Sequence, residues 1–207
     1  MKNNIFYLLF FVTILAFGQE QKLSAAEATA FKNGVNATAK STKTLSADFV
    51  QYKHMDFLSK DIETEGKISF KAPSMLLWQY VKPYQYSVVF KNNKISINDA
   101  GKKNAMDTSN SKMFAKLNKL IVGSVNGDMF DENEFTISYF KSGEFVLTRL
   151  VPKDAALKKY IKEMDLYFDK KNMVSKVKMT EPSDDYTTIV FKNKVVNAPI
   201  SDSVFNN

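Results

Sequence analysis

Side chains able to do chemistry are few and scattered in this 207-residue sequence. It contains one histidine, His54, and no cysteine. His54 lies in a turn-like segment, residues 52–56, where a histidine is usually an exposed loop residue rather than a catalytic base. No Ser-His-Asp spacing, Gly-x-Ser-x-Gly motif or His-Glu-x-x-His motif occurs. We therefore expect that the protein is not an enzyme.

The carboxylates form no catalytic pair or metal site. Asp61, Glu63 and Glu65 recur at every second position, so they share one face of a predicted strand. Because apolar residues occupy the other face, we expect these acids to face water. Asp184 and Asp185 fall in a predicted turn, the usual place for solvated acids. With one histidine and no cysteine, only carboxylate sites for hard cations are possible, and no spacing arranges one. We expect neither a metal nor a cofactor.

Bulky apolar side chains, in contrast, are abundant: the sequence contains seventeen phenylalanines, nine methionines and one tryptophan. Burial in the core is the default for any one of them. As a set, they exceed what a thin sheet-on-helix core needs, and they suit a cavity lined by aromatic and adaptable methionine side chains that accepts lipid chains. Within residues 66–86, a polar–apolar alternation breaks around Trp78. We predict that Leu76, Trp78 and Tyr80 face this cavity, while Leu77 and its neighbours Met75 and Val81 pack the other side.

The elements that position these residues can be predicted from periodicity. Ser24 and Glu27 form a capping-box pattern, and Ala26, Ala30, Phe31 and Val35 follow at helical spacing, which predicts an amphipathic helix. From Leu45 the period changes to two, which predicts strands. Further strands bounded by turn residues are predicted at 62–70, 84–90, 94–98, 135–140, 145–151, 161–168, 173–180 and 186–192.

A second helix is predicted at residues 111–123, with an apolar stripe of Met113, Phe114, Leu117, Leu120 and Ile121. An extended antiparallel meander tends to curl, and two helices can cover its concave face. The predicted fold class is mainly β with an α lid: an incomplete, half-open antiparallel β-barrel of about eleven strands covered by helices.

The N-terminus indicates export. Lys2, an apolar run over residues 5–17 and the small residues Ala16 and Gly18 are typical of a secretory signal peptide cleaved after residue 18. The run is shorter than the roughly 20 residues that span a bilayer. We therefore expect residues 1–18 to be removed, residues 19–207 to form a single domain, and the protein to be a periplasmic monomer. The net charge of +7 comes mainly from dispersed lysines, a pattern that does not favour nucleic-acid binding.

Several motifs occur in one order along the chain. Residues 66–78, GKISFKAPSMLLW, contain the pattern G-x-[IL]-x-[FW]-x-x-P-x-x-[LM]-x-W. Phe-Val-Gln at 49–51 precedes it, and Lys-Pro at 82–83, GEFVL at 143–147, DYTTIVF at 185–191 and Asn197 follow. Together these motifs resemble the LolA family of periplasmic outer-membrane lipoprotein carriers over essentially the whole mature chain.

The resemblance implies an incomplete barrel that accepts the acyl chains of lipoproteins. Its cargo would be acylated lipoproteins, its donor an inner-membrane lipoprotein-releasing transporter, and its destination an outer-membrane acceptor. A helix that fills the empty cavity would compete with ligand and so permit release. The predicted cavity and lid residues are Phe49, Ile68, Phe70, Leu76, Trp78, Tyr80, Val88, Phe90, Met113, Phe114, Leu117, Leu120, Ile121, Phe145, Leu147, Leu166 and Phe168.

One position departs from the family pattern. Well-studied members of the family carry an arginine directly before the proline, and that arginine holds the lid closed. In this chain the position is occupied by Ala72. Its single arginine, Arg149, is the candidate substitute. Two other functions stay open: a relative that carries another amphiphile, such as a glycolipid or a lipid-linked pigment precursor, and a periplasmic lipoprotein-sensing domain. A lipid hydrolase is disfavoured by the missing catalytic groups.

Overall fold

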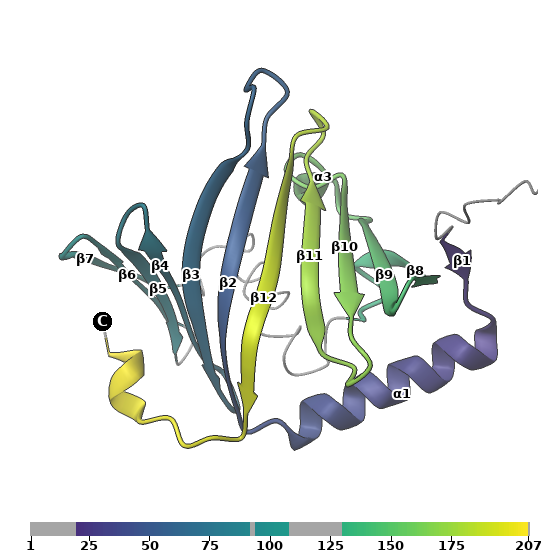
Figure 1. Ribbon diagram of the computed structural model, residues 1–207, viewed down its shortest axis with the longest axis horizontal. Coiled ribbons are helices and arrows are strands. Elements are labelled where there is room, and N and C mark those ends of the chain that lie inside the picture. Colours follow the sequence, from purple (N-terminus) through teal and green to yellow (C-terminus); the bar gives the residue numbers. More distant parts are fainter. Residues whose placement is uncertain (1–19, 92–93, 108–129, 207) are drawn as a thin grey trace, which may run out of the picture.

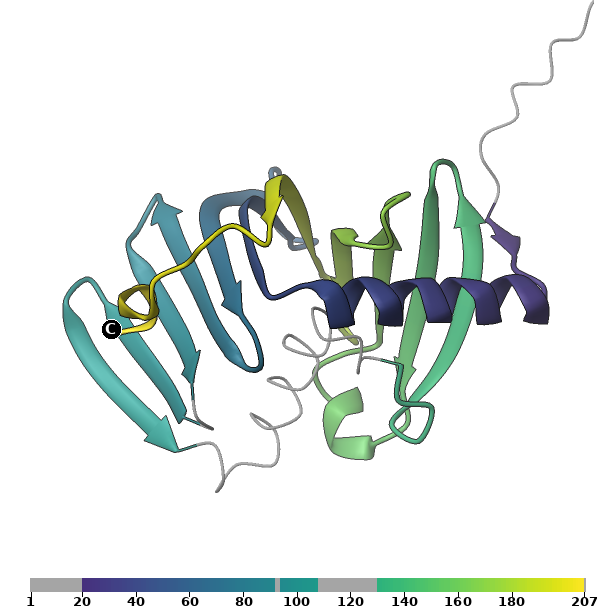
Figure 2. The ribbon, with the colours of Figure 1, turned by 90° about the horizontal axis from the view of Figure 1, so that it is seen from below.

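A curved antiparallel sheet with a long helix across one end makes up most of the protein (Figures 1 and 2). The computed structural model describes residues 20–91, 94–107 and 130–206. The sheet order is β1-β8-β9-β10-β11-β12-β2-β3-β4-β5-β6-β7, and the sheet stays open rather than closing into a barrel. Its strands are β1 (Gln21–Lys22), β2 (Thr44–His54), β3 (Ile62–Lys71), β4 (Met75–Lys82), β5 (Tyr86–Lys91), β6 (Lys94–Asp99), β7 (Lys102–Asp107), β8 (Phe135–Ser142), β9 (Phe145–Pro152), β10 (Glu163–Phe168), β11 (Val174–Thr180) and β12 (Tyr186–Val196).

Helix α1 (Ala25–Ser41) begins at the predicted capping box. The Glu27 backbone N–H donates to Ser24 Oγ at 3.3 Å, and the Ser24 backbone N–H donates to Glu27 Oε2 at 2.8 Å. Phe31 and Val35, on the apolar stripe of the helix, are buried against the sheet. The face of the sheet that receives α1 is called the inner face below.

Strand alternation gives this inner face two apolar cores. One core joins α1 to β8, β9 and β10 through Phe31, Val35, Tyr139, Leu150 and Phe168, among others. The other lies on β2 to β6 and contains Leu45, Phe49, Ile68, Phe70, Leu76, Phe90 and Ile95. Both cores follow from the period-two pattern, because alternate side chains of each strand point to the same face.

Strands β4 and β5 are apolar on their outer face as well, because the C-terminal segment covers it. The 3₁₀ helix η2 (Asp202–Phe205) contacts both strands. Lys71 donates to the carbonyl of Ile200 at 2.9 Å, and Lys91 donates to Asn206 at 3.0 Å. Val89, which alternates with the inner-face residues of β5, is only 2% exposed. The broken alternation around Trp78 thus reflects strands whose outer face is partly covered, with Leu77 half-buried and Val89 fully buried.

Gly66 is needed because two groups approach its backbone closely. A Cβ built there would lie 2.2 Å from Cζ of Phe49 and 2.3 Å from the carbonyl oxygen of Gln79. Phe49 pairs with Gly66 across β2 and β3, and its ring covers the space above the glycine. The absence of a side chain therefore lets Phe49 lie flat against the inner face.

The observed elements extend the predicted ones. Strands β1 and β7 and the short helix α3 (Ala155–Lys158) were not predicted, since β1 has two residues and β7, KKNAMD, has no apolar alternation. The predicted helix at 111–123 and the predicted signal peptide at 1–18 lie outside the described residues. Within the described part of the chain, no helix is long and apolar enough to cross a membrane.

Candidate functional site: an apolar cavity on the inner face

A cavity of about 380 Å³ lies on the inner face, between the strands that carry the β2–β6 core and those that carry the α1 core. Strands β4 and β5 form one wall, β9 to β11 form the other, and β2 and β12 form the floor between them. Its wall is almost entirely apolar and carries no charged side chain among the described lining residues. These residues are Gln51, Trp78, Tyr80, Tyr86, Val88, Phe90, Leu150, Ile161, Met164, Leu166, Val174, Val177, Met179, Thr187, Ile189 and Phe191.

Aromatic rings hold the β4 side of the cavity in place. The ring of Trp78 lies 4.6 Å from that of Phe49 and meets the ring of Phe191 edge to face at 6.2 Å. Tyr80 packs edge to face on Phe49 at 5.4 Å and lies 6.2 Å from Tyr86. Such pairs contribute beyond simple area burial and favour particular relative orientations of the rings. This wall is therefore built of rings that pack on one another, whereas the opposite wall carries Met164 and Met179, whose flexible side chains can adapt to a ligand.

The few polar groups in the cavity gather near its upper end, where the β2–β3 hairpin lies in Figure 1. The Tyr80 hydroxyl donates to Gln51 Oε1 at 3.0 Å. Burial raises the pKa of the Tyr80 phenol, so its hydroxyl keeps its proton and remains a donor. Further up the same face of β2, Lys53 pairs with Glu181. The polar groups of the large cavity therefore gather at its hairpin end.

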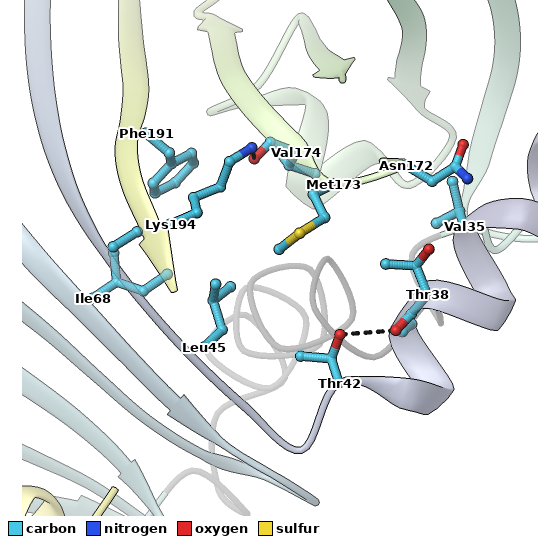
Figure 3. Close-up of a pocket in the computed structure, with 12 residues that line it drawn as sticks. Val35, Thr38, Thr42, Leu45, Ile68, Asn172, Met173, Val174, Phe191 and Lys194 are labelled. Atoms are coloured by element: carbon cyan, nitrogen blue, oxygen red, sulfur yellow. Dashed lines mark hydrogen bonds between the residues drawn. The ribbon is translucent and has the colours of Figure 1, made fainter. Parts of the chain in front are cut away.

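At the opposite end, a smaller cavity of about 50 Å³ lies between α1 and the sheet (Figure 3). It shares Val174 and Phe191 with the larger cavity. Met173 points into it between Leu45 and the helix (Figure 3). Lys194 also borders it, but its ammonium group is bound to Asp169 Oδ2 at 2.6 Å. The lower end of the site is thus closed by α1 and mixes apolar side chains with Thr38, Thr42 and Asn172, and its one lysine is neutralised by Asp169.

The structure brings together only part of the predicted site. Trp78, Tyr80, Val88, Phe90 and Leu166 line the cavity. The other inner-face residues pack beside it: Phe49, Ile68, Phe70 and Leu76 belong to the β2–β6 core, and Phe168 belongs to the α1 core. The predicted lid residues Met113, Phe114, Leu117, Leu120 and Ile121 lie outside the described residues.

Phe145, Leu147 and Arg149 lie on the outer face instead of the predicted inner one. Their neighbour Leu150 faces the cavity, so the alternation of β9 turns these three residues away from it. The guanidinium of Arg149 binds both carboxylate oxygens of Asp165, at 2.8 and 2.9 Å, and lies 3.2 Å from Glu20. Asp165 is only 5% exposed, and its hydrogen bonds with Arg149 raise the pKa of the arginine further. These contacts describe an outer-face ion pair, and no latch contact is seen for Arg149 among the described residues.

Several cavity residues were absent from the predicted site, most of them on β11 and β12. Thr187, Ile189 and Phe191 recur at every second position, which was a usable signal. Thr188 and Val190 between them are equally suited to a strand, so the sequence did not show which set faces inward. Gln51 was not predicted to line the cavity and was noted only as the last residue of the Phe-Val-Gln motif, although its side chain supplies a polar group there.

The open sheet, the helix across its inner face and the apolar cavity define a half-barrel protein of the LolA-like class. Residues 40–207 match the family described as "Outer membrane lipoprotein carrier protein LolA". The chain therefore belongs to the LolA family, whose members are periplasmic carrier or binding proteins rather than enzymes. No curated protein matches the sequence.

Several solved structures are similar to this one at low sequence identity. MucB superposes with a TM-score of 0.54 at 10% identity, covering 89% of this chain and 64% of MucB. Lipoprotein LppX of Mycobacterium tuberculosis gives a TM-score of 0.49 at 10% identity, covering 86% and 99% of the two chains. A LolA superfamily protein from Nitrosomonas europaea gives 0.46 at 8% identity, covering 87% and 97%. The MucB similarity shows a common fold.

Proposed function

We propose that the protein is a periplasmic carrier that shields the acyl chains of lipoproteins in its inner-face cavity and ferries them from the inner to the outer membrane. The observation that carries the proposal is an uncharged, almost wholly apolar cavity in a chain that belongs to the LolA family. Each CH₂ group moved out of water is worth about 0.8 kcal/mol, so acyl chains need such a shelter to cross the periplasm.

The proposal implies a donor, a cargo and an acceptor. The donor is an inner-membrane lipoprotein-releasing transporter, the cargo is an acylated lipoprotein, and the acceptor lies at the outer membrane. The chain works as a monomer, needs no cofactor and catalyses no reaction. Support for a binding rather than a catalytic role comes from the wall of the cavity, in which apolar side chains outnumber the few polar ones.

Two measurements test the carrier function. The first is native mass spectrometry and lipid extraction of the protein purified from the periplasm, in which we expect acylated lipoproteins bound one to one. The second is titration with a dipalmitoyl lipopeptide, followed by the fluorescence of Trp78, the single tryptophan. Co-purification of a different amphiphile would favour a specialised relative, and an empty protein that also ignores the lipopeptide would refute the proposal.

Adjacent residues of β12 provide a matched pair of variants for that titration. Ile189 lines the cavity, whereas Thr188 alternates with it and pairs with Lys178 of β11 on the outer face. Ile189→Asp places a carboxylate among the acyl chains and should weaken lipopeptide binding at least tenfold, because a buried charge without a partner is costly. Thr188→Asp adds the same charge to the same strand and should leave binding within twofold of wild type.

A further inference from the structure

The large cavity adjoins another cavity at each of its two ends. At the α1 end, the cavity of about 50 Å³ shares Val174 and Phe191 with it. At the hairpin end, a cavity of about 640 Å³ shares Ile161 and Met179 with it. The three cavities therefore follow one another along the inner face, from α1 to the turn between β11 and β12.

The cavity at the hairpin end lies at the protein surface. Its lining comes from the segment between α3 and β10 and from the β11–β12 turn. Lys159, Pro182 and Ser183 are exposed there, and Tyr160 is 61% exposed. A polar headgroup placed at this end would therefore keep its contact with water and would meet an ammonium and a hydroxyl group.

The cavity at the α1 end is enclosed. Val35 and Leu45, which line it from the helix and from β2, are 3% and 8% exposed. Three of its polar side chains are already paired: the hydroxyl groups of Thr38 and Thr42 donate to backbone carbonyl groups, and the ammonium group of Lys194 is bound to a carboxylate. This end therefore suits a hydrocarbon terminus, since a headgroup buried here would lose its water without gaining comparable partners.

From this arrangement we infer that a fatty acyl chain lies along the large cavity with its methyl end under α1, and that Met173 sets the longest chain that the site accommodates. The inference rests on the proposed function and adds the direction and the length of the bound chain. The Met173 side chain points into the small cavity between Leu45 and α1 (Figure 3), beyond the shared residues Val174 and Phe191. A chain that passes these two residues would therefore end against Met173.

The cavity volumes indicate where this limit falls. A cavity of about 150 Å³ holds benzene with its six carbons, so the large cavity has room for roughly fifteen carbons and the small one for about two more. One acyl chain of about sixteen to eighteen carbons would thus fill both. Met173 also lines a surface pocket beyond the α1 end, so a shorter side chain at this position lengthens the available path.

The test measures affinity as a function of chain length. Displacement of the apolar probe 1-N-phenylnaphthylamine is followed with saturated 1-acyl-glycerophosphocholines of increasing length, each below its critical micelle concentration. For wild type, affinity should rise about fourfold with each added CH₂ group that is buried. This rise should stop at about sixteen to eighteen carbons.

Two substitutions of Met173 should move the limit in opposite directions. Met173→Ala frees room for about two carbons, so it should raise the affinity for the 20-carbon ligand about 15-fold relative to the 14-carbon ligand. Met173→Phe should bring the limit to shorter chains. Met179→Ala, the matched control, removes the same atoms at the hairpin end and should change the affinity for every ligand by one common factor. Each affinity is divided by the wild-type value for the same ligand, so differences in ligand solubility cancel.

The outcomes separate this inference from the proposed function. If the ligands bind but neither substitution of Met173 changes the dependence on chain length, the role of Met173 is overturned while the carrier role stands. If Met179→Ala shows the length dependence instead, the chain lies in the opposite direction and the inference is equally overturned. If no acyl ligand displaces the probe, the inference and the proposed function both fail.

Discussion

Replacing Gly66 by alanine should destabilise the protein by about 2 to 3 kcal/mol, the upper part of the usual range for overpacking. The added Cβ would lie 2.2 Å from the Phe49 ring and 2.3 Å from the carbonyl oxygen of Gln79. The ring could tilt, but the carbonyl belongs to the paired backbone of β4 and cannot move without disturbing the β3–β4 ladder. The clash must therefore strain either the sheet or the rotamer of Phe49.

Urea unfolding followed by circular dichroism measures the loss, which corresponds to a fall in melting temperature of about 5 to 10 °C for a chain of this size. Gly34→Ala is the matched control. There the new Cβ meets only the end of the Asn172 side chain, 2.8 Å away, which can rotate aside. Alanine is also the better helix former by roughly 0.5 to 1 kcal/mol. Gly34→Ala should therefore leave the free energy of unfolding unchanged or raise it. Surface substitutions usually change that free energy by no more than about 0.5 kcal/mol. A smaller loss than this for Gly66→Ala would refute the packing argument.

Two further predictions concern charged groups away from the cavity. Burial alone would raise the pKa of Asp169, but hydrogen bonds from Lys194 and from the backbone N–H of Met173 outweigh it and hold that pKa below its usual value. A carboxylate whose pKa is lowered by folding stabilises the folded protein above its unfolded-state pKa, and this stabilisation is lost as the pH falls. Asp169→Asn should therefore lower the free energy of unfolding by about 2 kcal/mol at pH 7 and by progressively less below about pH 4. Unfolding measured between pH 2 and pH 7 checks this, and a pH-independent cost would contradict it. Arg149→Met should cost about 3 kcal/mol, because it leaves Asp165 buried without its partner, yet it should leave lipopeptide affinity unchanged. A changed affinity at unchanged stability would instead restore the latch role of Arg149.

Local signals in the sequence predicted much of the fold. The capping box at Ser24 and Glu27 fixed the start of α1, and the alternation along β2 to β5 placed Trp78, Tyr80 and Val88 on the cavity side. These predictions succeeded because each depended on neighbours in the chain and on one buried face. The half-open barrel was predicted from a meander too long to stay flat and from two helices that could cover its concave face, and the resemblance of the ordered motifs to the LolA family implied the same fold.

The inner face of β9 could not be predicted, for a physical reason. Phe145, Leu147, Leu150 and Val151 are apolar at both odd and even positions, so period-two reasoning has no contrast to use. The outer face of β9 is itself sheltered, since Leu147 pairs with Tyr167 of β10 and is fully buried. Two-sided burial, here and on β5, is a property of the folded sheet, in which distant segments cover a face that the local sequence would assign to water.

The strand order also determines when the cavity comes into existence. β2 to β7 and β8 to β12 each pair in chain order, and the two series meet only where β12 lies beside β2, with Phe49 opposite Phe191. One wall of the cavity belongs to each series, so the site is complete only after this long-range pairing, the kind of step that slows folding. Cargo that touches both walls would in turn hold the seam together. By the same linkage, a partner that weakens the pairing of β2 with β12 would lower the affinity for cargo.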